Sequence, residues 1–231
     1  MSLCARPADS AAATERGRRF SGMLCVVLLT LFTYGVWRLT HGLTIWTFDD
    51  WRQEQIVEGS LQAQAVSVRG PSPSWLWSPT RADAGGQVYL VDFIYTRCPT
   101  VCRALGSEFQ QIQTALRESA APEAKRVRLV SMSFDVSRDD VHALKQFAAQ
   151  MHAEPRWWQL GVPASQADAN ALLRSLGVVV IPDGEDGFVH NGAIHVLDAQ
   201  GRLRGLYEPG QWRQALDAAY RWAGRPAGAP L

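Results

Sequence analysis

Two cysteines directly after a buried strand limit what this chain can fold into. The run Val88 to Tyr95 is almost continuously apolar, and Cys98 and Cys102 follow it closely. A strand buried on both faces that passes into a helix is typical of α/β proteins. Thiols at positions i and i+4 would lie on one helical face, with the first sulfur near the helix N-terminus, where thiolate is favoured over thiol. A thiolate is both the nucleophile of disulfide exchange and a soft ligand for Cu(I) or zinc, so the stretch allows either chemistry.

Hydrophobic periodicity predicts the elements that follow. Apolar residues at helical spacing after Cys102 predict a helix, a second apolar strand follows at Val127 to Phe134, and Ser137 to Asp140 resembles a capping box. The remaining expected elements are a short strand at 157–160, a helix capped by Ser165 and ended by Gly177, a hairpin of strands at 193–197 and 203–206, and a helix from about residue 210. Parallel crossovers that end in a hairpin predict an α/β fold, a thioredoxin-like sheet with flanking helices. In such a sheet the thiols lie at the carboxyl end of a central strand, where ligands usually bind.

The N-terminal part of the chain has the pattern of a membrane anchor. Residues 20–37 carry no charge, a length that suits one transmembrane helix better than the core of a signal peptide. Arginines at positions 16, 18 and 19 precede the run and acidic residues at 49 and 50 follow it, so the positive-inside rule places the N-terminus in the cytoplasm. No Ala-x-Ala cleavage site follows the run, and we expect an uncleaved single-pass anchor in a bacterial inner membrane. The expected domains are a cytoplasmic segment at 1–19, a transmembrane anchor at 20–40, a tether and lead-in at 41–70, and a periplasmic thioredoxin-like domain at 71–231.

Composition excludes two other classes of protein. The formal net charge is +1, which gives no basis for nucleic-acid binding. Of the four cysteines, Cys4 and Cys25 fall in or before the apolar run, so Cys98 and Cys102 are the only pair in the predicted domain. An exported domain with one close pair is not a disulfide-stapled scaffold.

Two further side chains lie close to the cysteines in this predicted topology. Asp92 interrupts the apolar strand, either as a partnered buried acid or as a proton relay. His190 precedes the strand Ala193 to Leu197, at the same end of the sheet as the thiols, where it is either a solvated turn residue or a third metal ligand. His195, within that strand, is expected to point into or across the sheet.

The cysteine motif and the histidine together resemble a known family. The run Phe93-Ile94-Tyr95-Thr96-Arg97-Cys98-Pro99-Thr100-Val101-Cys102, followed far downstream by His190, is similar to the Sco/SenC family of cytochrome oxidase assembly proteins. In that family a membrane-anchored thioredoxin-like domain binds one copper through the two motif cysteines and a histidine placed like this one. The resemblance therefore implies copper ligands at Cys98, Cys102 and His190. It also implies that Asp135 supports the site without binding metal.

Two positions depart from the family pattern, and a third feature favours metal binding. Arg103 stands where members usually carry proline, and Val189 stands where they carry an acidic residue. The first change brings a cation near the thiolates, and the second removes a partner for the imidazole. Thioredoxin-like reductases place a cis-proline before the hairpin, whereas the equivalent stretch here, residues 189–192, contains none. Two thiolates and one imidazole suit a three-coordinate Cu(I) site, with an added water or oxygen ligand for Cu(II).

The resemblance implies a copper metallochaperone rather than an enzyme. Its expected partners are the copper-centre subunit of a cytochrome oxidase and another copper chaperone or a thiol reductant. The alternative is a periplasmic thiol–disulfide oxidoreductase in which Cys98 attacks and Cys102 resolves. Both functions need reduced thiols, whereas only copper binding needs His190. A copper or redox sensor is a third class, and an inert disulfide is disfavoured because a four-residue separation closes little loop entropy.

Overall fold

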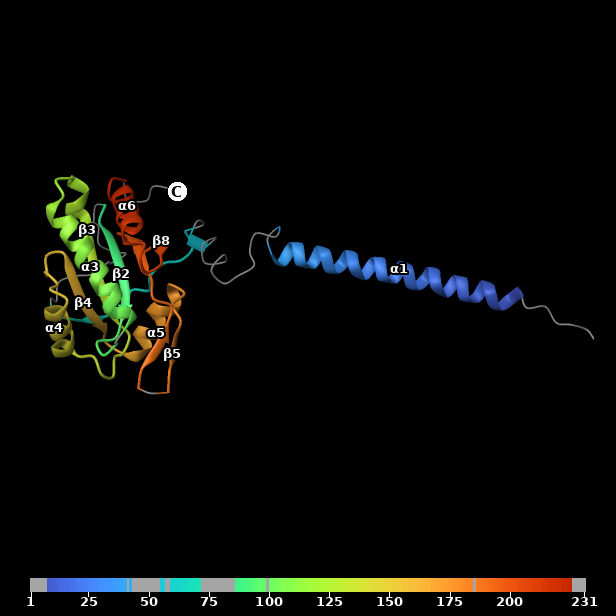
Figure 1. The fold of residues 1–231 in the computed structure, drawn as a ribbon, viewed down its shortest axis with the longest axis horizontal. Coiled ribbons are helices and arrows are strands. Elements are labelled where there is room, and N and C mark those ends of the chain that lie inside the picture. Colours follow the sequence, from blue (N-terminus) through green and yellow to red (C-terminus); the bar gives the residue numbers. More distant parts are fainter. Residues whose placement is uncertain are drawn as a thin grey trace, which may run out of the picture. The chain divides into compact units, whose positions relative to one another are not determined.

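The computed structural model describes residues 8–40, 42, 55–56, 59–71, 86–98, 100–184 and 186–225, with side chains from Phe20 onward. The chain divides into two compact units, residues 1–51 and residues 52–231. The ribbon in Figure 1 labels the elements of both units.

The first unit contains one long helix, α1 (Ala8–Leu39). Its segment Phe20–Leu39 is long and apolar enough to cross a membrane, and its large apolar side chains are exposed. Such a surface agrees with the predicted N-terminal apolar helix, because lipid would cover apolar side chains of this kind in a membrane. The acidic residues at positions 49 and 50, on which the expected membrane orientation depends, lie outside the described residues, as does Cys4.

A six-stranded sheet forms the centre of the second unit, in the order β1-β4-β3-β2-β7-β8. Strands β2 (Val88–Ile94), β3 (Val127–Ser133) and β4 (Trp158–Pro163) are parallel neighbours. Strand β7 (Ile194–Asp198) pairs antiparallel with β2, and β8 (Leu203–Tyr207) pairs antiparallel with β7. All seven residues of β2 are buried, as its continuous apolar run predicts for a central strand.

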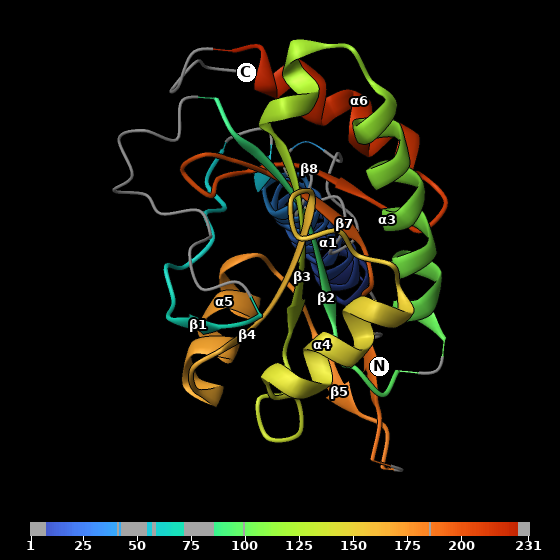
Figure 2. The same cartoon turned by 90° about the vertical axis from the view of Figure 1, so that its left-hand side faces the viewer.

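Helices cover both faces of this sheet. Figure 2 shows α3 (Val101–Glu118) and α6 (Trp212–Ala223) on one side and α5 (Gln166–Ser175) on the other. The helically spaced residues Leu105, Phe109, Ile112 and Leu116 of α3 are all buried, because one apolar stripe faces the sheet. The shorter helix α4 (Val141–Gln150) and the 3₁₀ turn η1 (Pro122–Arg126) complete the crossovers. The predicted α/β, thioredoxin-like arrangement is confirmed.

The caps of the helices follow the predictions in one case and not in another. Ser165 caps α5 as expected, accepting a hydrogen bond from the Asp168 amide, and Gly177 ends the segment with a φ of 65°. The predicted capping box at Ser137 to Asp140 is wrong. Asp140 alone is the N-cap of α4, with its carboxylate accepting from the Ala143 amide. A single carboxylate satisfies the first-turn amide, which leaves the residues before it available for other contacts.

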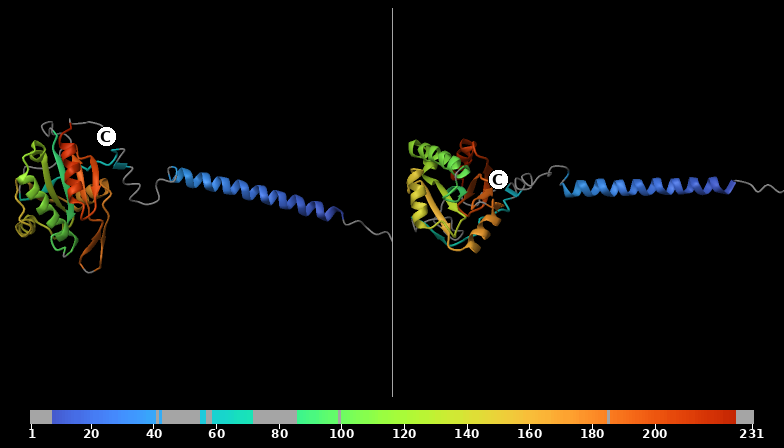
Figure 3. Two further views of the ribbon diagram at one scale, coloured as in Figure 1. Left: turned by 45° about the horizontal axis from the view of Figure 1, so that its top comes forward. Right: turned by 60° about the horizontal axis from the view of Figure 1, so that its bottom comes forward.

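Three short strands were not predicted. A separate hairpin, β5 (Val180–Pro182) and β6 (Phe188–His190), precedes β7, so His190 ends a strand and does not lie in a turn. In Figures 1 and 3 this orange hairpin and the green connection from β2 to α3 lie at the same end of the sheet. The edge strand β1 (Val68–Arg69) pairs with β4.

Part of the segment expected to be a tether, residues 41–70, packs on the domain. Ile56 and Ala63 are buried in the core, and the Ala63 amide donates to the Gly201 carbonyl at 2.8 Å. Gly70 passes so near β4 that a Cβ would lie 2.5 Å from the Leu160 carbonyl oxygen. The compact unit thus begins before residue 71, because apolar residues ahead of β1 are drawn into the core.

Candidate metal centre

The register of the sheet brings the cysteines and His190 to one end. Strand β2 ends at Ile94, four residues before Cys98, and β7 runs antiparallel to it with Val91 opposite His195. The start of β7, and with it the end of β6, therefore lies beside the end of β2. The site is thus at the carboxyl end of the parallel strands, as predicted.

Cys98 lies in the connection and not in the helix, which corrects the expectation that both thiols share a helical face. Its amide donates to the Tyr95 carbonyl at 3.0 Å, and α3 begins only at Val101. The residue before a proline is disfavoured in helical conformation, and Pro99 follows Cys98. Thr100 makes no side-chain cap. Instead, the sulfur of Cys98 accepts the first-turn amide of Cys102 at 3.3 Å, which places it where helix N-termini favour negative charge.

The two thiols differ in protonation. Hydrogen bonding from Cys102, helped by the His190 side chain and the Cys102 amide, lowers the pKa of Cys98 far below its ordinary value, although burial opposes the change. Hydrogen bonding to Cys98 and then burial raise the pKa of Cys102. The pair therefore loses its first proton more readily from Cys98, while Cys102 keeps its proton to higher pH. Both cysteines are buried and free of disulfide.

The imidazole of His190 faces the second thiol. Its Nε2 lies 3.8 Å from the Cys102 sulfur, and its ring packs edge-on against Phe134 with centroids 5.3 Å apart. The next residue, Asn191, ties this strand end down, because its side-chain oxygen accepts from the Val179 amide at 2.8 Å. Nδ1 of His190 is buried and has no hydrogen-bond partner among the described residues, in line with the valine that replaces an acid at position 189.

The donor set suits a soft metal ion, although the side chains are not closed around a point. No group of three or more His, Cys, Asp or Glu side chains within the described residues has the geometry of a preformed metal site. The structure nevertheless brings the three predicted residues together, through the contacts of Cys98 with Cys102 and of Cys102 with His190. Two sulfurs and one imidazole nitrogen match the ligands of Cu(I) and zinc.

Asp92 is buried beneath α3. It pairs in register with Ser131 on β3, and Ser131 accepts a hydrogen bond from the Trp158 indole, which packs on Phe109 of α3. Neighbours in register point to the same face of a sheet, so Asp92 faces α3 as well. Neither carboxylate oxygen has a hydrogen-bond partner among the described residues. Burial raises the pKa of Asp92 to about 7, against a smaller lowering effect of Ser131.

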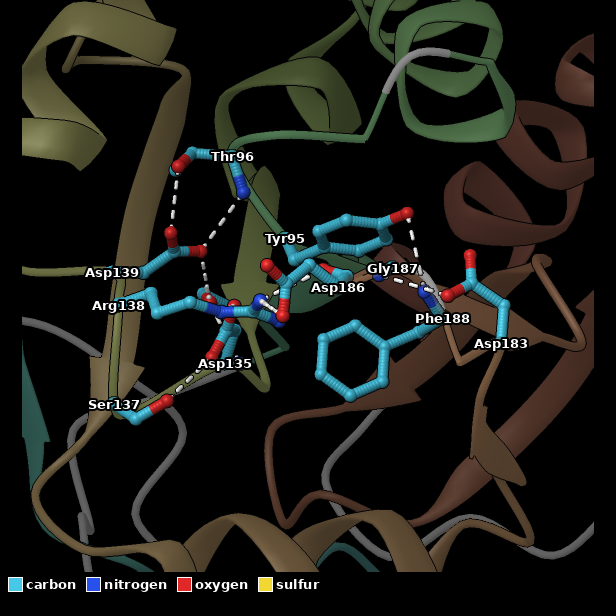
Figure 4. Close-up of polar contacts among 11 residues, drawn as sticks. Tyr95, Thr96, Asp135, Ser137, Arg138, Asp139, Asp183, Asp186, Gly187 and Phe188 are labelled. Atoms are coloured by element: carbon cyan, nitrogen blue, oxygen red, sulfur yellow. Dashed lines mark hydrogen bonds and ion pairs between the residues drawn. The ribbon is translucent and has the colours of Figure 1, made fainter.

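The loop between β3 and α4 makes the polar contacts shown in Figure 4. Asp135, which was expected to support the site, accepts from the Ser137 hydroxyl at 2.9 Å and from Nε of Arg138. Asp139 accepts from the amide and the hydroxyl of Thr96. Arg138 and Asp139 were not predicted from the sequence, because the pattern at residues 137–140 was interpreted as a capping box. A charged run directly after a buried strand, at the end that carries the thiols, was the available signal.

A cavity of about 540 Å³ opens beside the centre. Its lining includes Tyr95, Arg97 and Thr100 from the cysteine loop and Phe188 and Val189 from the hairpin. These residues are sequence neighbours of Cys98 and His190, so the cavity lies next to the candidate ligands, while both cysteines are themselves buried. Two carboxylates, Asp183 and Asp186, also line it.

Two other residues considered from the sequence do not join the centre. His195 is buried within β7, where its Nδ1 lies 3.2 Å from the Ala193 carbonyl and its ring meets Phe93 edge-on. It thus points into the fold as predicted. Arg103, expected to bring a cation near the thiolates, is exposed on α3.

Known proteins resemble this chain in sequence and in structure. The SCO1 protein homolog of Bacillus subtilis is 30% identical over 120 residues, which cover 51% of this chain and 60% of that protein. The match thus spans less than two thirds of the relative's length. A SCO1/SenC family lipoprotein from Bacillus anthracis superposes with a TM-score of 0.53 at 23% identity, covering 61% of this chain and 84% of that one. Yeast Sco1, solved with copper bound, superposes with a TM-score of 0.51 at 13% identity, covering 63% and 81% respectively. At these identities the superpositions establish the fold.

The match to a family model extends further along the chain. The SCO1/SenC model covers residues 78–223, which include the cysteine motif, the β3–α4 loop, the hairpin and the terminal helix. Because this match takes in more than half of the residues and all of the candidate site, the chain belongs to the SCO1/SenC family.

Proposed function

We propose that this protein carries copper as a cargo, held by Cys98, Cys102 and His190, for assembly of the copper centre of a cytochrome oxidase. The observation that carries the proposal is the meeting of three donors from two distant segments. The His190 nitrogen lies 3.8 Å from the Cys102 sulfur across 88 positions of sequence. Yeast Sco1 holds copper in its crystal structure, and the family membership makes the same cargo the natural choice here.

The protonation of the thiols suits the loading and release of a soft cation. The lowered pKa of Cys98 favours its thiolate form, and Cys102 gives up its proton when it becomes a ligand. The cavity beside the site would let a partner's thiolates approach, replace the three donors one at a time and take the copper by ligand exchange. The expected acceptor is the copper-centre subunit of an oxidase, and the expected donor is another copper chaperone.

The apolar segment Phe20–Leu39 supports a location at a membrane. We propose that it anchors the protein in a bacterial inner membrane with the domain in the periplasm. An anchored carrier would meet an integral membrane partner by diffusion in two dimensions.

Thiol–disulfide exchange is the second candidate function, and the low pKa of Cys98 favours it. In this reaction the Cys98 thiolate attacks one sulfur of a target disulfide and releases one target thiol. Cys102, once deprotonated, attacks the Cys98 sulfur of the mixed disulfide, which releases the second target thiol and leaves a Cys98–Cys102 disulfide. Two electrons pass to the target, and a thiol reductant must restore the pair.

Copper stoichiometry on the reduced full-length chain in detergent tests the proposal. The parent protein carries Cys4→Ser and Cys25→Ser, so that only the candidate thiols remain. We expect one copper per chain, loss of copper in Cys98→Ser, and roughly tenfold or more weaker binding in His190→Ala, since one of three donors is removed. His142→Ala, on α4, is the matched control and should bind like the parent. A parent protein that holds no copper yet reduces a disulfide substrate rapidly would overturn copper carriage in favour of the reductase.

A further inference from the structure

The loop between β3 and α4 lies between the two halves of the candidate metal centre. Two consecutive residues of this loop contact different segments, as Figure 4 shows. Asp139 contacts the connection that carries Cys98, and Arg138 contacts the hairpin that carries His190. The same short loop thus touches both segments from which the ligands come.

Asp139 holds the turn before Cys98. Its carboxylate is buried and accepts from the Thr96 amide at 2.8 Å, the Thr96 hydroxyl at 2.6 Å and the Ser133 hydroxyl at 2.6 Å. Hydrogen bonds to a buried carboxylate are among the stronger ones in proteins. The Cys98 amide, two residues further on, donates to the Tyr95 carbonyl. The backbone is therefore fixed on both sides of Thr96 immediately before the first thiol.

Arg138 holds the hairpin before His190. Its Nη1 donates to the Asp186 carbonyl at 2.7 Å, and its guanidinium lies 5.1 Å from the centroid of the Phe188 ring. Its Nε donates to Asp135, which fixes the guanidinium plane. Phe188 in turn packs edge-on against Tyr95 at 5.2 Å and Phe134 at 5.3 Å. Phe188 and His190 are alternate residues of β6, so they share one face of the hairpin.

The hairpin is held to the domain through its inward face. Among the described residues its two strands of three residues pair only with each other, and Val179, Ile181 and Val189 are exposed. An isolated two-stranded hairpin is marginally stable in water. The position of His190 relative to Cys102 therefore depends on the inward packing of Val180, Phe188 and His190 itself, and on the Asn191 side chain. Arg138 covers the Phe188 ring.

We propose that Arg138 and Asp139 are positioning residues that set the two halves of the centre independently, Arg138 the imidazole half and Asp139 the thiol half. The proposal rests on the copper site argued above. It assigns each half a separate control within one loop, so that a change at either residue loosens one donor segment and leaves the other in place.

A double-mutant cycle for copper affinity, on the full-length Cys4→Ser, Cys25→Ser chain, tests this assignment. Arg138→Met keeps the aliphatic stem and removes the guanidinium, and Asp139→Asn keeps the shape and removes the charge. We expect each to weaken copper binding by about tenfold, as supporting residues of metal ligands do. In a His190→Ala background Arg138→Met should cause no further loss, whereas Asp139→Asn should cost the same factor as before.

Matched controls separate positioning from general destabilisation. Arg117→Met, in the last turn of α3, breaks an exposed ion pair with Glu154. Asp198→Asn removes a buried carboxylate that pairs with Arg204 at the opposite end of the sheet. Neither should change copper affinity. The proposal is wrong if Arg138→Met weakens binding equally with and without His190, or if the two controls weaken it as much.

Amide hydrogen exchange on the metal-free protein keeps this test independent of the proposed function. Arg138→Met should speed exchange in peptides covering residues 187–190 and leave exchange at the Cys98 and Cys102 amides unchanged. Asp139→Asn should speed exchange at those two amides and leave it unchanged in residues 187–190. If the parent held no copper, copper carriage would fail while this pattern still decided the positioning roles. Unchanged exchange, or the same acceleration in both peptides for both variants, would overturn them.

Discussion

The layer beneath α3 and the β3–α4 loop each bury a carboxylate, and they differ in what surrounds it. Asp92 is 0% exposed with neither oxygen hydrogen-bonded among the described residues, whereas Asp139 is 1% exposed and accepts three hydrogen bonds. A buried charge is costly unless polar groups surround it. The loop supplies these groups and uses the carboxylate to hold the backbone. The interior beneath α3 supplies almost none, and it raises the pKa of the carboxyl instead.

This comparison shows that burial alone does not decide what an acidic residue does. Asp139 fixes a turn next to a candidate ligand, so its charge contributes to structure. Asp92 lies near Cys102, and the negative charge of Asp92, when present, is one of the effects that raise the pKa of that thiol. The same substitution, aspartate to asparagine, should therefore change stability in opposite directions in the two regions.

The largest effect is expected for Asp92→Asn at alkaline pH. Burial raises the pKa of Asp92 from 3.8 to about 7, so between these values the unfolded state ionises and the folded state keeps its proton. Raising the pH through this window therefore destabilises the wild-type fold, and the penalty is complete above about pH 7. At about 1.4 kcal/mol per pKa unit the upper limit is about 4 kcal/mol.

Urea unfolding of the two proteins at about pH 4 and about pH 8 measures this prediction. The free energy of unfolding of Asp92→Asn should rise relative to the wild type as pH increases. Taking the change between the two pH values cancels any constant cost of burying the amide. Parallel pH profiles for the two proteins would show that Asp92 is ionised in the fold or is not buried as described.

Asp139→Asn should have the opposite sign and a smaller size. The amide cannot accept at both positions where the carboxylate does, so at least one of the bonds from Thr96 or Ser133 is lost. Hydrogen bonds to charged groups contribute about 1.5–3 kcal/mol each, and we expect a loss of about 2 kcal/mol in the free energy of unfolding near neutral pH. Urea unfolding beside Asp92→Asn gives the comparison directly, and stabilisation by both changes would contradict it.

The elements of the sheet could be predicted from the sequence, because each has a strong local pattern. The strand at Val88, the buried stripe of α3 and the hairpin of β7 and β8 were all recognisable from periodicity and turn residues. The hairpin of β5 and β6 was not, since each strand has only three residues and one face is exposed. Short strands carry too few residues for a period of two to appear.

The candidate ligands could also be predicted, whereas Arg138 and Asp139 could not. Cys98 and Cys102 form a local motif, and His190 follows from the order of strands. Arg138 acts through the backbone of residue 186 and the ring of Phe188, about fifty positions away. Such a contact depends on how two loops meet at the end of the sheet, and no local pattern encodes that meeting. Cys98 was placed in the helix because the geometric effect of Pro99 was not considered.

The smallest predicted effect concerns the packing of the hairpin end on α3. A Cβ at Gly192 would lie 2.8 Å from Cγ2 of Val101, and the same point is 3.6 Å from Cε1 of His190. Val101 is β-branched and begins the helix, so its side chain has little freedom to move. Gly192→Ala should therefore push the strand end from α3 by a few tenths of an ångström and move His190 relative to Cys102. We expect copper affinity to fall severalfold, which is less than the tenfold loss expected for Arg138→Met or Asp139→Asn.

Gly106→Ala provides the matched comparison within α3 itself. A Cβ there would lie 2.7 Å from the sulfur of Met151, an overlap as close as the one at Gly192. Methionine is flexible and can move aside, and alanine is the better helix former by about 1 kcal/mol. We therefore expect unchanged copper affinity and unchanged or slightly higher stability, measured by competition for copper and by urea unfolding on the same samples. Equal losses of affinity in both variants would mean that the centre responds to general crowding of α3, and the contact between the hairpin and Val101 would lose its special role.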